Sequence, residues 1–223
     1  MIDFLIKSTI CLTVFLGFYH LVLEREKIHQ FNRFYLLGSI IISLVIPFVT
    51  YQIITEIPVY VDAEMEFYPT IIQTEKVVEP IDYFKIISWS LYGLITLLFA
   101  IRFGKNAWKL ISKTISNPKV KYKNANLILI DEKTLPHTFL NFIYINFEDY
   151  NNRNIEDELY THELVHVTQK HTLDILFIEF LKVIFWFNPI FIFYKKAIQL
   201  NHEFLADEEI VKTYNNVPFY QNL

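Results

Sequence analysis

The stretch His162-Glu163-Leu164-Val165-His166 decides how the rest of this chain is interpreted. A helix is predicted to begin near Asn154, and on it the two histidines lie about 40° apart, so both imidazoles can reach one ion at the ~2.0–2.1 Å typical of zinc. Glu163 lies beside them, where it can act as general base toward a water that the ion activates. Chance would produce this pattern only about 0.02 times in a chain of this composition. The spacing therefore predicts half of a catalytic metal site.

A third protein ligand must come from elsewhere, because a catalytic zinc takes three and leaves one position for water. Residues 201–207 are the best source, since Glu203 and Asp207 lie one turn apart on a predicted helix. We predict that Glu203 binds the ion and that Asp207 orients a metal-bound histidine. Two alternatives stay open: His202 as the third ligand, and Asp207 as a solvated charge or as the acceptor of a backbone N–H.

Two further histidines lie near this pattern. His171 follows His166 by five residues, which turns it away from the ligand face of the helix, so a structural contact with Asp174 is expected. His137 lies in a predicted loop between two strands and is a candidate for the substrate side of the cleft.

The composition indicates a membrane protein. Of the 223 residues, 53% are hydrophobic and 17% aromatic. Apolar stretches at 2–23, 34–54 and 83–103 each have close to the ~20 residues that cross a bilayer. The first stretch lacks a small-residue cleavage site and is expected to remain as an anchor. A net charge of −4 brings no basic excess, so no nucleic acid partner is expected, and the single Cys11 excludes an internal disulfide.

The charges predict an orientation, because lysine and arginine next to a span favour the cytoplasmic side. Basic residues follow the first and the third apolar stretches, whereas residues 55–82 are strongly acidic. The N-terminus is therefore predicted to lie outside, and residues 55–82 to form an extracytoplasmic loop. Residues 1–103 would be the membrane region, and residues 104–223 a cytoplasm-facing metallopeptidase domain.

Residues 104–223 are expected to combine a short sheet with a helical hairpin. Runs at 127–130 and 142–147 indicate strands. We predict that the helix through His166 continues to about Phe187 and that a return helix runs from 190 to 210, because Asn188-Pro189 interrupts the apolar stretch. A re-entrant hairpin at about 172–200 is favoured over a fourth crossing. Inside it, Glu179 and Lys182 are expected to pair.

The fold class expected is a mainly α integral membrane protein. It would have three transmembrane helices plus the re-entrant hairpin, and a small cytoplasmic α+β zincin-like part with a short β-sheet.

Four stretches carry a resemblance to a known family: Pro136–Phe139, H-E-L-V-H at 162–166, W-F-N-P at 186–189 and H-E-F-L-A-D at 202–207. The chain resembles the bacterial membrane metallopeptidases of the BlaR/MecR type, the beta-lactam sensor-transducers, which are gluzincins. The resemblance implies His162, His166 and Glu203 as Zn²⁺ ligands and Glu163 as general base and acid. It also implies that peptides add to an edge strand of the small sheet, at 142–145.

The chain departs from the antibiotic sensors in ending at Leu223 without a penicillin-binding sensor domain, so it is expected to be a fragment, and sensing of beta-lactams is not expected. The expected function is a zinc endopeptidase of the bacterial inner membrane that signals by cleaving a cytoplasmic repressor or itself. The expected partners are that protein substrate, the lipid bilayer and a second copy of the chain in a homodimer. The alternative is a catalytically silent scaffold that keeps a structural zinc fold. A transporter is disfavoured, because the first three stretches show no polar path.

Overall fold

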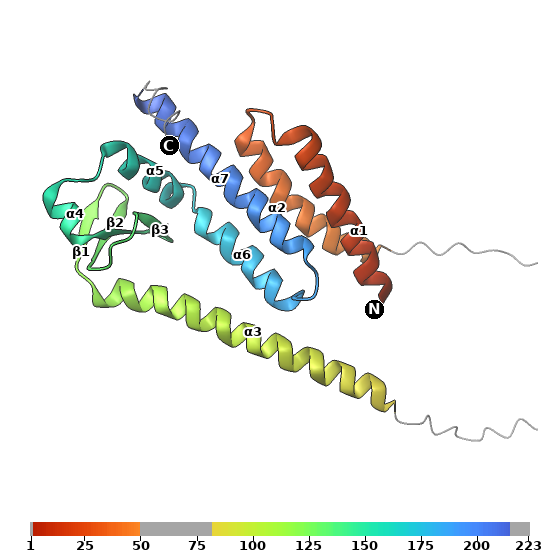
Figure 1. The fold of residues 1–223 in the computed structure, drawn as a ribbon. Helices are drawn as coiled ribbons and strands as arrows, with labels where there is room; N and C mark the ends of the chain where they lie inside the picture. Colours follow the sequence, from red (N-terminus) through yellow and green to blue (C-terminus); the bar gives the residue numbers. More distant parts are fainter. Residues whose placement is uncertain (1, 50–81, 215–223) are drawn as a thin grey trace, which may run out of the picture.

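The computed structural model describes residues 2–49 and 82–214. The predicted acidic loop therefore lies, except for Asp82, outside the described residues. Those residues are mainly helical, with one small sheet (Figure 1). In chain order the elements are α1 (Ile2–Phe18), η1 (Tyr19–Leu23), α2 (His29–Val45), η2 (Ile46–Phe48), α3 (Tyr83–Ser116), β1 (Lys119–Tyr122), β2 (Ala125–Ile130), β3 (His137–Phe139), β4 (Phe142–Asn146), α4 (Phe147–Asn152), α5 (Asp157–Thr168), α6 (His171–Ile184) and α7 (Ile190–Tyr214).

Among the described residues, three helical stretches are long and apolar enough to span a membrane: Asp3–Leu23, His29–Phe48 and Tyr83–Ser116. They correspond to the three predicted spans. The second begins earlier than the predicted residue 34, because the buried Asn32 side chain donates to the carbonyl of Leu23 at 2.9 Å and thereby ties the helix start to the end of the preceding span. The third continues past residue 103 as one helix.

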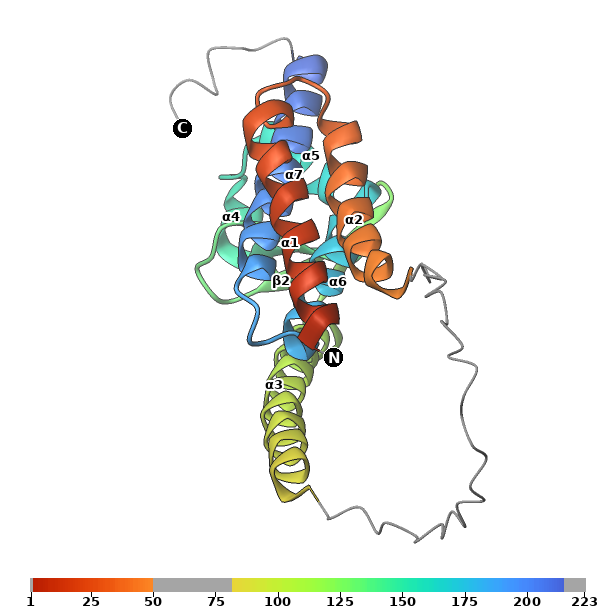
Figure 2. The same ribbon diagram turned by 90° about the vertical axis from the view of Figure 1, so that its right-hand side faces the viewer.

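Four helices form a bundle around one apolar core. Figures 1 and 2 show α1 and α2 lying against the pair α6 and α7. The hydroxyl of Tyr194 on α7 lies 3.0 Å from Oγ of Ser39 on α2 and donates to the carbonyl of Leu12 on α1 at 3.2 Å. The core side chains with less than 2% of their surface exposed include Leu12, Tyr19, Leu36, Ile40, Ile178, Phe191 and Tyr194.

Helices α6 and α7 form the predicted helical hairpin. Its turn is tied to both sides of the molecule: the Asn188 amide donates to Oγ1 of Thr9 on α1 at 2.9 Å, and Tyr92 of α3 donates to the carbonyl of Ile184 at 2.8 Å. Because Thr9 and Tyr92 belong to apolar spans, the turn lies at the level of those spans. Insertion of the hairpin into a membrane stays a prediction.

The prediction of one continuous helix from His166 to Phe187 is wrong. The chain breaks between α5 and α6, where Lys170 adopts a left-handed conformation with φ of 57°. Helix α5 packs on the sheet and α6 packs in the bundle, so the two helices serve different cores and one straight helix could not fill both.

The sheet has four strands in the order β1-β2-β4-β3, of which the sequence predicted two. Strands β2 and β4 pair in parallel, and the outer pairs are antiparallel. The expectation that 142–145 is an edge strand is wrong. Strand β4 is central, because it pairs with β2 along one edge and with β3 along the other. Its side chains are buried on both faces of the sheet, since Ile143 and Ile145 pack toward α5 and Tyr144 packs toward α3. The edge strand on this side of the sheet is β3, which lies within the stretch Pro136–Phe139.

Candidate metal centre

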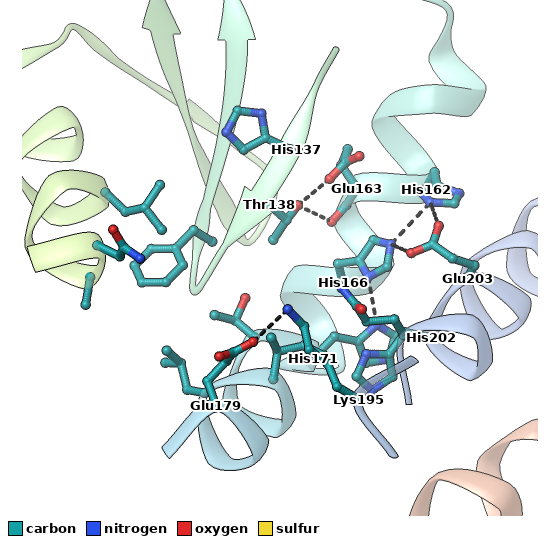
Figure 3. A pocket seen from close by; sticks show the side chains of 18 of the residues that line it. His137, Thr138, His162, Glu163, His166, His171, Glu179, Lys195, His202 and Glu203 are labelled. Atoms are coloured by element: carbon teal, nitrogen blue, oxygen red, sulfur yellow. Dashed lines mark hydrogen bonds and ion pairs between the residues drawn. The ribbon is translucent and has the colours of Figure 1, made fainter. Parts of the chain in front are cut away.

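Helix α5 presents one face to the sheet and another to a cavity. Acidic residues Asp157 and Glu158 occupy its first turn, where the helix dipole favours negative charge. Tyr160, Leu164 and Val167 follow at helical spacing and pack on the sheet core. The side turned toward the C-terminal helix α7 carries His162 and His166, whereas Glu163 lies on the neighbouring side, next to Thr138 of β3 (Figure 3).

The structure brings His162, His166 and Glu203 together, with one possible ligand atom of each within 4.8 Å of the others. The Nε2 atoms of the two histidines are 3.2 Å apart, and Oε2 of Glu203 lies 3.2 Å from Nε2 of His162. Two ligand atoms on a tetrahedral zinc at ~2.05 Å would be about 3.3 Å apart. The longer separation is 3.8 Å, from Oε1 of Glu203 to Nε2 of His166. Among the described residues, these two imidazoles and the carboxylate therefore have a spacing with which they could hold a zinc ion.

Asp207 lies one turn beyond Glu203 on α7, with Oδ1 3.3 Å from Nδ1 of His162. The contact directs the other nitrogen of His162 toward the ligand cluster. Burial lowers the pKa of His162, but hydrogen bonding to Asp207 and Glu203 outweighs it and raises that pKa to about 9. A metal ion at Nε2 would displace this proton, so metal binding and proton release are linked.

The other two candidate ligands are ready to bind a cation. Burial lowers the pKa of His166 to about 4, so its ring is neutral near pH 7. Hydrogen bonding to His162 lowers the pKa of Glu203, which keeps the carboxylate charged.

Glu163 points away from the three ligands, toward strand β3 (Figure 3). Its side chain is buried, and the Thr138 hydroxyl lies 2.6 Å from Oε2 and 3.1 Å from the backbone oxygen of Glu163. Burial raises the pKa of Glu163 to about 7, against the smaller lowering effects of Thr138 and His162. A carboxyl that titrates near neutrality is suited to accept and return a proton.

A cavity of about 570 Å³ opens beside this cluster, between α3, β3, α5, α6 and α7. His137 lines it from the start of β3, with its ring stacked on Tyr144 at 5.0 Å between centroids. At another part of the lining, Lys195 contacts Glu179 at 2.6 Å, and Lys182 completes the predicted pair with Glu179 at 3.0 Å. The cavity thus joins the metal-binding cluster to a charged patch on the hairpin.

Two other histidines near the cluster have partners of their own. His202 is the neighbour of Glu203 but its Nε2 lies 2.9 Å from Oδ2 of Asp174, so the ring is directed away from the ligand cluster. His171 does not bond to Asp174: its Nδ1 lies 2.8 Å from Nδ1 of His166. The break before α6 is the reason, because it rotates His171 back toward α5.

Two residues that contact the site, Thr138 and Arg33, were not predicted from the sequence. Thr138 lies next to His137 inside the stretch Pro136–Phe139, so that stretch was the available signal. For Arg33 the sequence offered no signal, because its partners Gln169 and Asp174 are more than 130 positions away.

Comparison with known families and proteins gave one match. A sequence profile of a family described as BlaR1 peptidase M56 matches residues 4–218, which is nearly the whole chain. No curated protein matches it.

Proposed function

Because the chain belongs to the BlaR1 peptidase M56 family, and is therefore a membrane-associated metallopeptidase of a signalling type, we propose that it is a zinc endopeptidase that cleaves a cytoplasmic regulator or itself. Its place would be the bacterial inner membrane, with the N-terminus outside and the metal centre at the cytoplasmic side. The basic residues that follow the first and third spans support this orientation.

The observation that carries the proposal is the position of Glu163. Its buried carboxyl lies next to the three candidate ligands but is hydrogen-bonded to Thr138 and not to any of them. A structural zinc site needs ligands but no base, and it normally has four protein ligands. Here the described cluster supplies three and a carboxyl poised for proton transfer. This combination favours an enzyme over the silent scaffold.

Each residue then has a defined task. His162, His166 and Glu203 would hold the zinc ion, which when bound supplies a Lewis acid for the scissile carbonyl and the attacking water. Glu163 takes the proton of the attacking water and returns it to the leaving amine. Thr138 holds the Glu163 carboxylate in place, and Asp207 fixes the ring of His162.

The substrate would be an extended segment of protein added to the outer edge of β3. Strand β3 pairs with β4 on one side and is an edge of the described sheet on the other, and all three of its residues line the cavity. A strand added there would run past Glu163. If the chain cleaves itself between molecules, a homodimer would supply this strand.

The test compares the wild-type chain with Glu163→Gln in membranes and after purification in detergent. Glu163→Gln should retain zinc, because it keeps all three ligands, and should lose cleavage by about 10²- to 10⁴-fold. Proteomic comparison of cells carrying the two proteins would identify the substrate. Glu156→Gln, an exposed acid just before α5, is the matched control. Equal cleavage by wild type and Glu163→Gln, or a wild-type chain without zinc, would refute the proposal.

A further inference from the structure

A buried polar cluster connects the candidate ligand His166 to the second apolar span. His171, His202 and Asp174 each have less than one tenth of their surface exposed. They lie between α5, α6 and α7, where His171 and His202 also line the cavity, and Arg33 of α2 contacts Asp174 from the bundle. Burying so many polar groups is unfavourable unless each has a partner. The contacts that these side chains make therefore indicate the role of the cluster.

The first contact determines which nitrogen of His166 can bind metal. Nε2 faces the other ligand atoms, so it must be unprotonated to bind, and the ring proton then resides on Nδ1. That proton is donated to Nδ1 of His171, 2.8 Å away. His171 in turn carries its own proton on Nε2, which lies 3.1 Å from Oε1 of Gln169. One tautomer of each ring satisfies all of these contacts.

The second set of contacts holds His171 itself. Its ring stacks on that of His202, with 3.9 Å between centroids and 3° between planes. His202 donates from Nε2 to Oδ2 of Asp174 at 2.9 Å, which keeps its ring in that position. His171 is therefore fixed by stacking on one side and by Gln169 at its edge.

Arg33 of α2 holds both of these supports. Its Nε donates to Oδ2 of Asp174 at 2.7 Å, and its Nη2 donates to the backbone oxygen of Gln169 at 2.7 Å. The guanidinium thus bridges the break between α5 and α6. Arg33 lies near the start of the span His29–Phe48, so a displacement of this span moves a direct partner of the cluster.

We propose that His171 is a positioning residue for the metal ligand His166, and that Arg33 acts through Asp174, His202 and Gln169 to hold His171, so that the second membrane span controls the affinity of the metal centre. The inference rests on the proposed zinc site and adds a route by which that site is regulated. Metal affinity is its direct measure, since outer partners of metal-binding histidines set ring orientation and basicity.

The first experiment replaces His171 in the full chain, purified in detergent. The zinc dissociation constant is measured by competition with a chromophoric chelator, and the visible spectrum of the Co²⁺-substituted protein reports ligand geometry. His171→Leu removes the acceptor and should weaken zinc binding about 10- to 100-fold. His171→Asn keeps an acceptor near the position of Nδ1 and should restore most of the affinity and the wild-type Co²⁺ spectrum. His20→Leu, at a half-exposed histidine on η1, is the control and should change neither. Wild-type affinity in His171→Leu overturns the proposal.

The second experiment tests the link to the membrane span. Arg33→Gln should weaken zinc binding roughly 3- to 30-fold. The control Arg25→Gln, at an exposed arginine between η1 and α2, should leave zinc binding unchanged. Arg33→Lys keeps a charge beside Asp174 but has one donor group in place of two. Its zinc affinity should lie between that of the wild type and that of Arg33→Gln. Adding Arg33→Gln to His171→Leu should cause little further loss, because both act through one chain of contacts. Melting of the metal-free proteins checks that each variant is folded.

Each outcome has one meaning. Additive losses in the double variant, or a folded Arg33→Gln protein with wild-type zinc affinity, overturn the inference. A wild-type chain that binds no zinc defeats the proposed function instead, so the two failures can be told apart.

Discussion

Replacing Thr138 by valine should move the acidic limb of the pH–activity profile to higher pH. The change keeps a β-branched side chain on strand β3 and removes the hydroxyl that lies 2.6 Å from Oε2 of Glu163. Glu163 must be deprotonated to accept a proton, and activity falls below its pKa. The hydrogen bond from Thr138 lowers this pKa, so its loss raises the pKa above its present value of about 7. The sign is therefore a loss of activity at acidic and neutral pH.

The size of the effect follows from the hydrogen bond. A hydrogen bond to a charged group contributes about 1.5–3 kcal/mol. If about 1.4 kcal/mol of it acts on the charge, the pKa rises by about one unit. At pH 6 the deprotonated fraction of Glu163 then falls from about 0.09 to about 0.01, whereas at pH 9 it changes only from about 0.99 to about 0.91. Activity should drop roughly ninefold at pH 6 and by about a tenth at pH 9.

The assay is kcat/KM for one internally quenched peptide between pH 5 and pH 9. Thr213→Val, at an exposed threonine of α7 that bonds only to the backbone of its own helix in the described contacts, is the matched control. A bound metal ion shifts the pKa of Glu163 in both proteins, so the difference between them is the quantity of interest. Superimposable acidic limbs, or an equal loss at every pH, would refute the assignment of Thr138 to the charge on Glu163.

Three further predictions concern the metal, the bundle and the topology. Glu203→Gln should reduce zinc affinity by more than about 100-fold, which is the largest loss expected from removing a residue that only supports a ligand. The control Glu209→Gln, at an exposed acid on the same helix, should not reduce it, and metal analysis with chelator competition measures both. Tyr194→Phe, which removes the hydroxyl shared by α1, α2 and α7, should lower stability by about 1 kcal/mol and the melting temperature in detergent by about 2–4 °C, and an unchanged melting temperature would contradict that tie. In a chain with Cys11 replaced by serine, single cysteines at Glu64 and Glu209 should be labelled from opposite sides of the membrane, and labelling from one side would rule out the hairpin.

Much of the fold could be predicted because its signals are local. Each apolar span is continuous in the sequence, so length and composition alone located it, and the described helices agree. The strands β1 and β3 were missed for a physical reason. Lys119–Tyr122 has half-exposed side chains and little apolar character, and His137–Phe139 has three residues. Both are strands because β2 and β4 offer them hydrogen-bonding edges, which is a tertiary effect.

Local sequence signals were enough to predict the helix that carries His162, Glu163 and His166, the return of Glu203 and Asp207 on a second helix, and the turn at Asn188-Pro189. Helical spacing and proline act over only a few residues, which is why these features could be predicted. The remaining contacts of the site depend on the packing of the whole chain. The helix ends before Lys170, whose left-handed conformation lets His171 contact His166, and His202 contacts Asp174. The same packing also brings Thr138 into contact with Glu163, and Arg33 into contact with Asp174. These partners are distant in the chain, and only the packing of the bundle against the sheet determines which buried polar groups must meet.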